Sequence, residues 1–145
     1  MKKILTLVIA IAFAFSLTAC GNPTFPSETT KQWDGEFGDG TVASLRIHED
    51  GEITIQSEDF VDPIVGTATK IENDYTDVNN GTWDVYALIS FDDENAEKIG
   101  AESAELRYCE DTLNNNNYVE LFLNGYENYA GWETNEYFLS QTMEE

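Results

Sequence analysis

Few residues of this 145-residue chain have the types and spacing that enzyme chemistry requires. The sequence holds no G-x-S-x-G, no S-x-x-K and no glycine-rich phosphate loop, the motifs that place a nucleophile or bind phosphate. A zinc site typically takes three or four His or Cys ligands, and His48 and Cys109 are too few. These two could form a thiol–imidazole pair, but we favour a solvent-facing strand histidine at His48. We therefore expect no catalytic constellation and no cofactor.

Carboxylates are abundant, and their chemistry suggests calcium binding or glycoside hydrolysis. Calcium takes carboxylate and carbonyl oxygens, and the run Asp92-Asp93-Glu94 offers three carboxylates together. No acidic loop has the spacing of the EF-hand calcium loop, so we favour a solvated acidic surface over a metal site. Paired carboxylates also hydrolyse glycosides, yet among 28 acidic residues some pair falls near any cleft by chance. A glycosidase is therefore the least favoured class of function.

Three aromatic residues at equal spacing, Tyr126, Tyr129 and Trp132, stand in the polar, glycine-containing stretch 124–135. Such side chains present a flat apolar face with a polar edge, which suits stacking on a sugar ring or anchoring a protein partner. The alternative is that the stretch closes one end of the domain and Trp132 belongs to the core, because large aromatic residues are mostly buried. Both interpretations stay open, and the three residues are the candidate binding site.

The charge balance limits the partners of the chain. It carries 7 Lys and Arg against 28 Asp and Glu, a formal net charge of -21. Each contact with a phosphate needs a Lys or Arg to replace counterions, so the charge argues against nucleic acid and an anionic membrane face as direct partners. Cations and basic proteins are favoured instead. The length allows one compact domain and leaves little room for a second.

The first residues have the layout of an export signal. Met1-Lys2-Lys3 is a basic start, and 4–19 is an apolar run that ends in small residues. This run is shorter than the roughly 20 residues that a membrane-spanning helix needs. The motif Leu17-Thr18-Ala19-Cys20 resembles the lipobox of bacterial lipoproteins.

That resemblance implies cleavage before Cys20, a diacylglyceryl group on its thiol and an anchor in the bacterial cell envelope. Two acyl chains suffice for stable anchoring. The stretch 21–31 contains two of the three prolines and reads as a tether. We therefore predict a signal peptide at 1–19, a lipidated tether at 20–31 and a single β domain at 32–145. Lipidation of Cys20 would leave Cys109 as a free, buried thiol.

The body of the chain alternates apolar and polar residues with period two. The clearest example is 43–48, followed by the turn-forming pair Asp50-Gly51 and by a second alternating stretch at 52–56. The predicted strands are 33–37, 43–48, 52–56, 64–71, 82–91, 104–110, 118–123 and 132–140. Only 92–99 reads as a short helix, with Gly100 as its stop. We predict an all-β antiparallel meander of about eight strands and favour a barrel over a sandwich, because the strands follow one another as hairpins.

The segment Trp33-Asp34-Gly35-Glu36-Phe37 at the first strand, with the meander after it, is similar to the lipocalin and streptavidin-like barrels. In those barrels a tryptophan near the first strand plugs one end. The resemblance implies a ligand-binding barrel. Trp33 and Trp83 are expected to be core residues.

Two classes of function follow, and both are noncatalytic. The first is an envelope-anchored binding lipoprotein that holds a small ligand, a sugar or a partner at the barrel mouth or on the aromatic stretch. The alternative is an acidic protein-interaction module, such as an inhibitor, immunity or assembly factor, that docks a basic partner and gains association rate from its charge.

Overall fold

The computed structural model describes residues 23–77, 81–111, 116–123 and 137–143. Within these ranges the chain forms eight strands and one helix. In chain order they are β1 (Gln32–Phe37), β2 (Val42–Ile47), β3 (Glu52–Ser57), β4 (Ile64–Asp77), β5 (Gly81–Phe91), α2 (Asp93–Ile99), β6 (Ser103–Asp111), β7 (Asn116–Leu123) and β8 (Tyr137–Met143).

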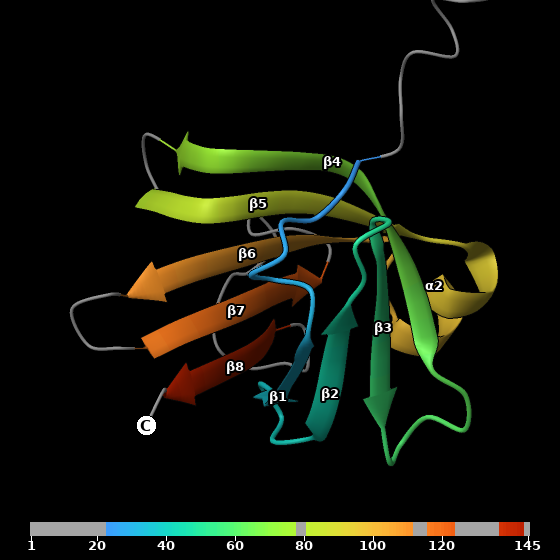
Figure 1. The fold of residues 1–145 in the computed structure, drawn as a ribbon. Coiled ribbons are helices and arrows are strands. Elements are labelled where there is room, and N and C mark those ends of the chain that lie inside the picture. The colour runs from blue at the N-terminus through green and yellow to red at the C-terminus, as the bar shows by residue number, and fades with distance from the viewer. Residues whose placement is uncertain (1–22, 78–80, 112–115, 124–136, 144–145) are drawn as a thin grey trace, which may run out of the picture.

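The strands close into an antiparallel barrel in sequence order (Figure 1). Each strand pairs with the next, and the ring closes where β1 meets β8 through Glu36 opposite Leu139 and Phe37 opposite Phe138. Helix α2 lies in the connection between β5 and β6, inside the predicted range 92–99. The predicted meander, the preference for a barrel and the single short helix are confirmed.

The β2–β3 hairpin forms at the predicted turn. Gly51 has a φ of 92°, which a residue without a β-carbon adopts at little cost. The amide of His48 donates to the carbonyl of Glu52 at 2.9 Å, and Ile47 lies opposite Ile53. The turn therefore sets a register in which the isoleucines of both strands face the core.

Strand β4 is longer than predicted. The sequence suggested a strand end near Ile71 and a turn from 73 onward, but pairing with β5 continues to Asp77. Asp74 takes a positive φ of 52°, a conformation that Asp tolerates better than most residues. Beyond it, Tyr75 stacks on the ring of Tyr86 at 4.2 Å between centroids. This contact with the neighbouring strand stabilises an extension that local sequence alone disfavours.

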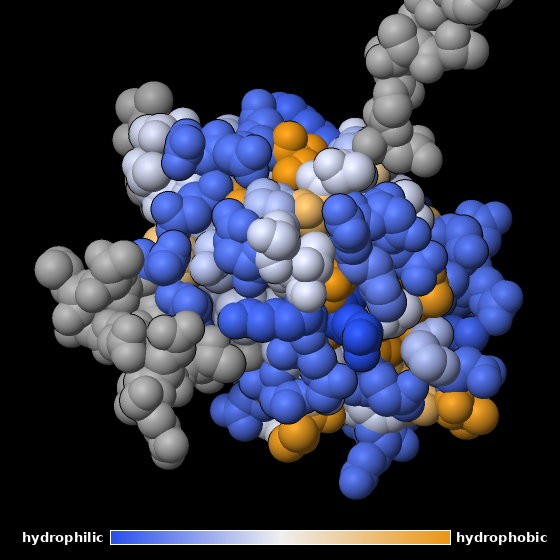
Figure 2. All heavy atoms as spheres, in the orientation of Figure 1, coloured by the Kyte–Doolittle hydropathy of each residue, from blue (hydrophilic) through white to orange (hydrophobic). Residues whose placement is uncertain are grey.

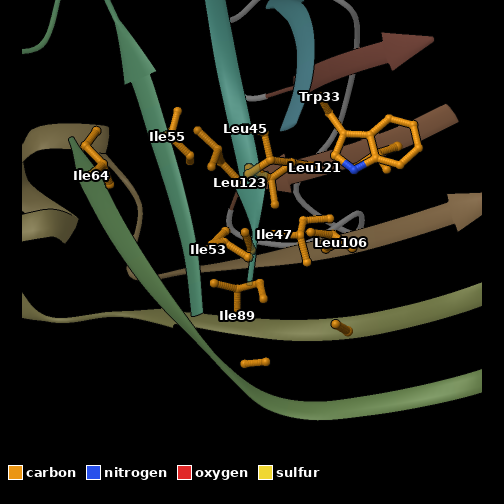
Figure 3. Packing of buried hydrophobic residues seen from close by; sticks show 14 of the residues in the cluster. Trp33, Leu45, Ile47, Ile53, Ile55, Ile64, Ile89, Leu106, Leu121 and Leu123 are labelled. Atoms are coloured by element: carbon orange, nitrogen blue, oxygen red, sulfur yellow. The ribbon is translucent and has the colours of Figure 1, made fainter. Parts of the chain in front are cut away.

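The barrel interior is a packed core over the described strands (Figure 3). The largest of its fully buried side chains are Trp33, Tyr108, Leu45, Ile47, Ile53, Ile55, Ile64, Ile89, Leu106, Leu121 and Val85. In small barrels, the inward-facing side chains fill the interior and form a packed core. Within the described strands, the barrel interior is therefore occupied by core side chains.

Trp33 belongs to this core and is fully buried, as predicted. Its Nε1 donates to the carbonyl of Thr29 at 3.1 Å. Its ring meets that of Tyr108 edge to face, with centroids 5.8 Å apart, and the Lys31 Nζ lies 4.4 Å from the ring centroid. The indole thus joins β1, β6 and the segment before β1.

The segment 23–31, which we call the strap, corrects the prediction of a free tether up to residue 31. Phe25 is 3 % exposed and belongs to the core, and its amide donates to the carbonyl of Glu49 at 3.1 Å. At the other end of the strap, the carbonyl of Lys31 accepts from the amide of Ile47 at 3.1 Å. The strap therefore runs along the barrel from the β2–β3 turn to β1 (Figure 1). Composition suggested a tether, but burial of one aromatic ring and these backbone bonds hold the segment in place.

We expect Gly51→Ala to loosen the strap. A β-carbon on Gly51 would lie 2.6 Å from the carbonyl oxygen of Pro23, in addition to the strain of the positive φ. The expected loss in the free energy of unfolding is about 1–3 kcal/mol, measured by urea denaturation. Gly40→Ala is the matched control, because Gly40 has a φ of 86° but open space around it. Equal losses in the two variants would contradict a stabilising contact between strap and turn.

Candidate binding site at the barrel mouth

One end of the barrel carries a pocket of about 170 Å³. We call this end the mouth, and it is formed by the β1–β2 turn, the β3–β4 loop, the end of α2 and the end of β7. The mouth lies at the opposite end of β2 and β3 from the turn that holds the strap (Figure 1).

The floor of the pocket is apolar. Phe37 and Leu123 are the last residues of β1 and β7, and both are nearly fully buried. Phe60 from the β3–β4 loop and Ile99 from the end of α2 are partly buried and pack against the core. The four side chains come from distant parts of the chain and meet because the barrel brings strand ends to one rim.

Helix α2 is fixed in position by its cap. The Asp92 carboxylate accepts the amide of Asn95 at 2.9 Å and its side-chain Nδ2 at 2.8 Å, which lowers the pKa of Asp92. The Asn95 Oδ1 in turn accepts the amide of Val65 at 2.8 Å, so the helix start is tied to β4. Gly100 ends the helix in the left-handed conformation. These bonds hold Ile99 at the pocket.

Two exposed carboxylates, Asp39 and Asp59, stand on the rim of the pocket. The Asp39 Oδ1 accepts the amide of Thr41 at 2.9 Å, and this hydrogen bond lowers the pKa of Asp39. The side chain is therefore oriented and stays ionised. The rim presents negative charge above an apolar floor.

Lys98 is the cation among the residues that line the pocket, and it is already paired. Its Nζ lies 2.7 Å from the Glu94 Oε1, four residues earlier on the same helix. This hydrogen bond, together with the charges of Glu94, Asp62 and Asp92, raises the pKa of Lys98. The acidic residues near the pocket thus outnumber its base.

Apolar side chains also reach solvent beside the pocket. Val42, the first residue of β2, is 70 % exposed, and Val61 in the β3–β4 loop is 98 % exposed. They are the exposed large apolar residues found in the described part of the chain. Figure 2 shows apolar atoms at the lower edge of a largely hydrophilic face, where the β1–β2 turn and the β3–β4 loop lie in Figure 1.

The calcium candidates Asp92, Asp93 and Glu94 do not converge on a common point. Asp92 caps the helix, Asp93 and Glu94 stand in its first turn, and Glu94 binds Lys98. Within the described ranges no group of three or more His, Cys, Asp or Glu residues is placed to hold a metal ion. These carboxylates cap the helix or stand in its first turn, where negative charge stabilises a helix.

The other predicted site residues lie outside the described residues. They are the aromatic candidates Tyr126, Tyr129 and Trp132, and the lipidation candidate Cys20. In the part of the chain that is described, no helix has both the length and the apolar character to cross a membrane.

His48 and Cys109 contact different residues. The His48 Nε2 lies 3.2 Å from the Thr54 Oγ1 in the β2–β3 hairpin. Cys109, on β6, contacts Tyr118 and Asp84, and burial raises the pKa of its thiol. Cys109 has no disulfide partner among the described residues and is half-buried rather than fully buried. A thiol with a raised pKa is a poor nucleophile, so these contacts support no thiol chemistry.

A second cluster, on the outer side of the barrel wall, was missed by sequence reasoning. Arg107 lies between the core residues Leu106 and Tyr108, so its side chain points away from the core. It is only 4 % exposed, because its guanidinium lies 4.2 Å from the Trp83 ring and 4.6 Å from the Phe122 ring.

The Arg107 Nη2 also donates to the Glu105 Oε2 at 2.9 Å. An arginine at an outward-facing position of a strand looks like an ordinary exposed residue in the sequence. Nothing in the local sequence indicates that rings from β5 and β7 will enclose it. Trp83 is buried as predicted, but it belongs to this outer cluster and not to the core cluster.

Fold alone does not determine function, because one barrel architecture supports many activities. The pocket, its carboxylates and its exposed valines are therefore the features on which a functional conclusion depends. No family model matches the chain, and neither a curated protein nor a solved structure is significantly similar to it.

Proposed function

We propose that this chain is a noncatalytic binding module, anchored to the bacterial cell envelope through Cys20, and that the barrel mouth is its binding site. One observation carries the proposal: the mouth holds an apolar pocket with a charged rim, whereas the barrel below it is filled by side chains. Concave apolar sites with a few placed polar groups are the usual form of binding sites in proteins. The anchor rests on the lipobox-like motif that ends at Cys20.

The titration of the mouth residues supports binding over catalysis. General acid–base catalysis is most efficient when the pKa of the catalytic group lies near the working pH. The hydrogen bond from Thr41 lowers the pKa of Asp39, and the pairing with Glu94 raises the pKa of Lys98. Both shifts move the pKa of the group farther from neutral pH, so both groups stay charged there. They can attract and orient a ligand but are poorly suited to transfer protons.

Site-specific photocross-linking tests this proposal in the full chain on its native membrane. A photoreactive amino acid at Val61, beside the pocket, is expected to give a discrete adduct. The matched control carries the same amino acid at Asn73, which is exposed on β4 away from the lining residues. Adducts of equal yield and identity from the two positions would contradict a binding site at the mouth.

A further inference from the structure

We infer that the occupant of the mouth is a basic segment of a partner protein that inserts one apolar side chain into the pocket. This inference rests on the proposed binding function and adds the chemical class of the partner. It follows from the size of the pocket, the apolar residues around it and the charges on its rim.

The size of the pocket indicates a single side chain. Pockets that bury a drug-sized ligand measure about 300–1,000 Å³. An apolar protein cavity of about 150 Å³ holds one benzene molecule. The mouth pocket of about 170 Å³ is therefore large enough for one aliphatic or aromatic side chain.

The surroundings of the pocket indicate a protein surface as the source of that side chain. An anchor residue in a protein interface is typically surrounded by contacts that exclude water from it. Val42 and Val61, exposed by 70 % and 98 %, offer such contacts beside the pocket. A small solute that filled the pocket would leave both valines in water. A protein segment that crosses the mouth would cover them.

The charges select a basic segment. Asp39 and Asp59 line the pocket. The pocket cation, Lys98, already pairs with Glu94, and Asp62 in the β3–β4 loop adds a further negative charge that interacts with it. An acidic partner would meet like charges here. A second copy of this chain is disfavoured for the same reason, because it brings 28 acidic residues and only 7 basic ones. A basic partner is attracted from a distance by the net charge of -21 and is then oriented by the rim.

Titration of the purified full chain with the blocked peptide Lys-Lys-Leu-Lys-Lys, followed by NMR, tests the inference. The peptide is expected to shift the methyl signals of Ile99 and Leu123, two residues of the pocket floor. The same peptide with alanine in place of leucine is expected to bind about 10-fold more weakly, because it lacks the side chain that the pocket buries. A version with glutamate in place of lysine is expected to give no shifts.

Paired charge variants separate rim contacts from general attraction. Asp39→Asn with Asp59→Asn is expected to weaken binding of the leucine peptide about fivefold. The control, Glu49→Gln with Asp50→Asn, makes the same change of charge in the β2–β3 turn at the other end of the barrel. It is expected to have little effect at physiological salt, where charges about 8 Å or more apart are largely screened.

Equal affinities for the leucine and alanine peptides, or equal effects of the two charge pairs, would overturn the inference in favour of unspecific attraction to a polyanion. Benzene serves as the neutral probe. If benzene shifts the Ile99 and Leu123 methyl signals and no peptide does, the mouth remains a binding site and only the basic partner is rejected. If neither probe shifts them, the proposed function fails as well.

Discussion

Trp33→Ala is expected to lower the free energy of unfolding by about 3–5 kcal/mol, the range for removing a buried tryptophan. The side chain is fully buried, and it joins Thr29 of the strap to Tyr108 of β6. Alanine would leave a cavity in the core and remove one of the two donors to the carbonyl of Thr29, which also accepts the amide of Lys31 at 2.9 Å. The large effect reflects the loss of both contacts at once.

Urea unfolding monitored by circular dichroism measures this loss. Trp33→Phe is the control, because phenylalanine keeps an aromatic ring against Tyr108 but cannot donate to Thr29. Its loss is expected to be clearly smaller than that of the alanine variant. A loss below about 1 kcal/mol for Trp33→Ala would mean that the core relaxes around the cavity, contrary to the packing described.

Arg107→Ala is expected to cost about 3 kcal/mol of stability. The substitution removes a guanidinium that contacts the rings of Trp83 and Phe122 and leaves the carboxylate of Glu105, which is 20 % exposed, without this partner. Loss of one member of a buried ion pair costs far more than loss of an exposed one. The expected effect therefore exceeds that of a surface arginine.

The double variant Arg107→Met with Glu105→Gln isolates the charge contribution. Methionine fills much of the volume between the two rings, and glutamine needs no counterion. This variant is expected to recover most of the stability that Arg107→Ala loses, because apolar replacements of buried ion pairs are often neutral. A cost under about 1 kcal/mol for Arg107→Ala, as measured by urea unfolding, would show that the pair behaves as an exposed one.

The strands could be predicted because their signal is local. Alternation of apolar and polar residues in 43–56 places every second side chain in the core, and Asp50-Gly51 specifies the hairpin between them. The order of strands in the barrel then follows from hairpin connections. Helix α2 has its cap residue Asp92 and its stop Gly100 in the sequence itself.

The errors arose where distant contacts override local sequence. Asn73 and Asp74 have turn propensities, yet β4 continues past them because Tyr75 stacks on Tyr86 of the next strand. The prolines and small polar residues of the strap suggested a tether, but Phe25 reaches the core. The local sequence around Tyr75 does not identify Tyr86 as its partner, and the local sequence around Phe25 does not indicate that it reaches the core.

The candidate site could be predicted only in part. An acidic surface that favours a basic partner follows from the excess of carboxylates, and the barrel mouth was one of two expected locations. The residues that build the pocket, such as Phe60 and Ile99, look like ordinary apolar residues at the ends of their segments. Their convergence is a consequence of barrel closure, which no local pattern encodes.

The strap determines how far the domain would stand from a membrane. Only Gly21 and Asn22 separate Cys20 from Pro23, where the packed chain begins. Three residue steps span at most about 11 Å. A diacylated Cys20 would thus keep the β2–β3 turn within roughly one nanometre of the headgroups. The mouth would then face away from the membrane, about one barrel length farther out than this turn. Proteins that approach from the aqueous compartment could reach it, whereas proteins in the lipid plane could not.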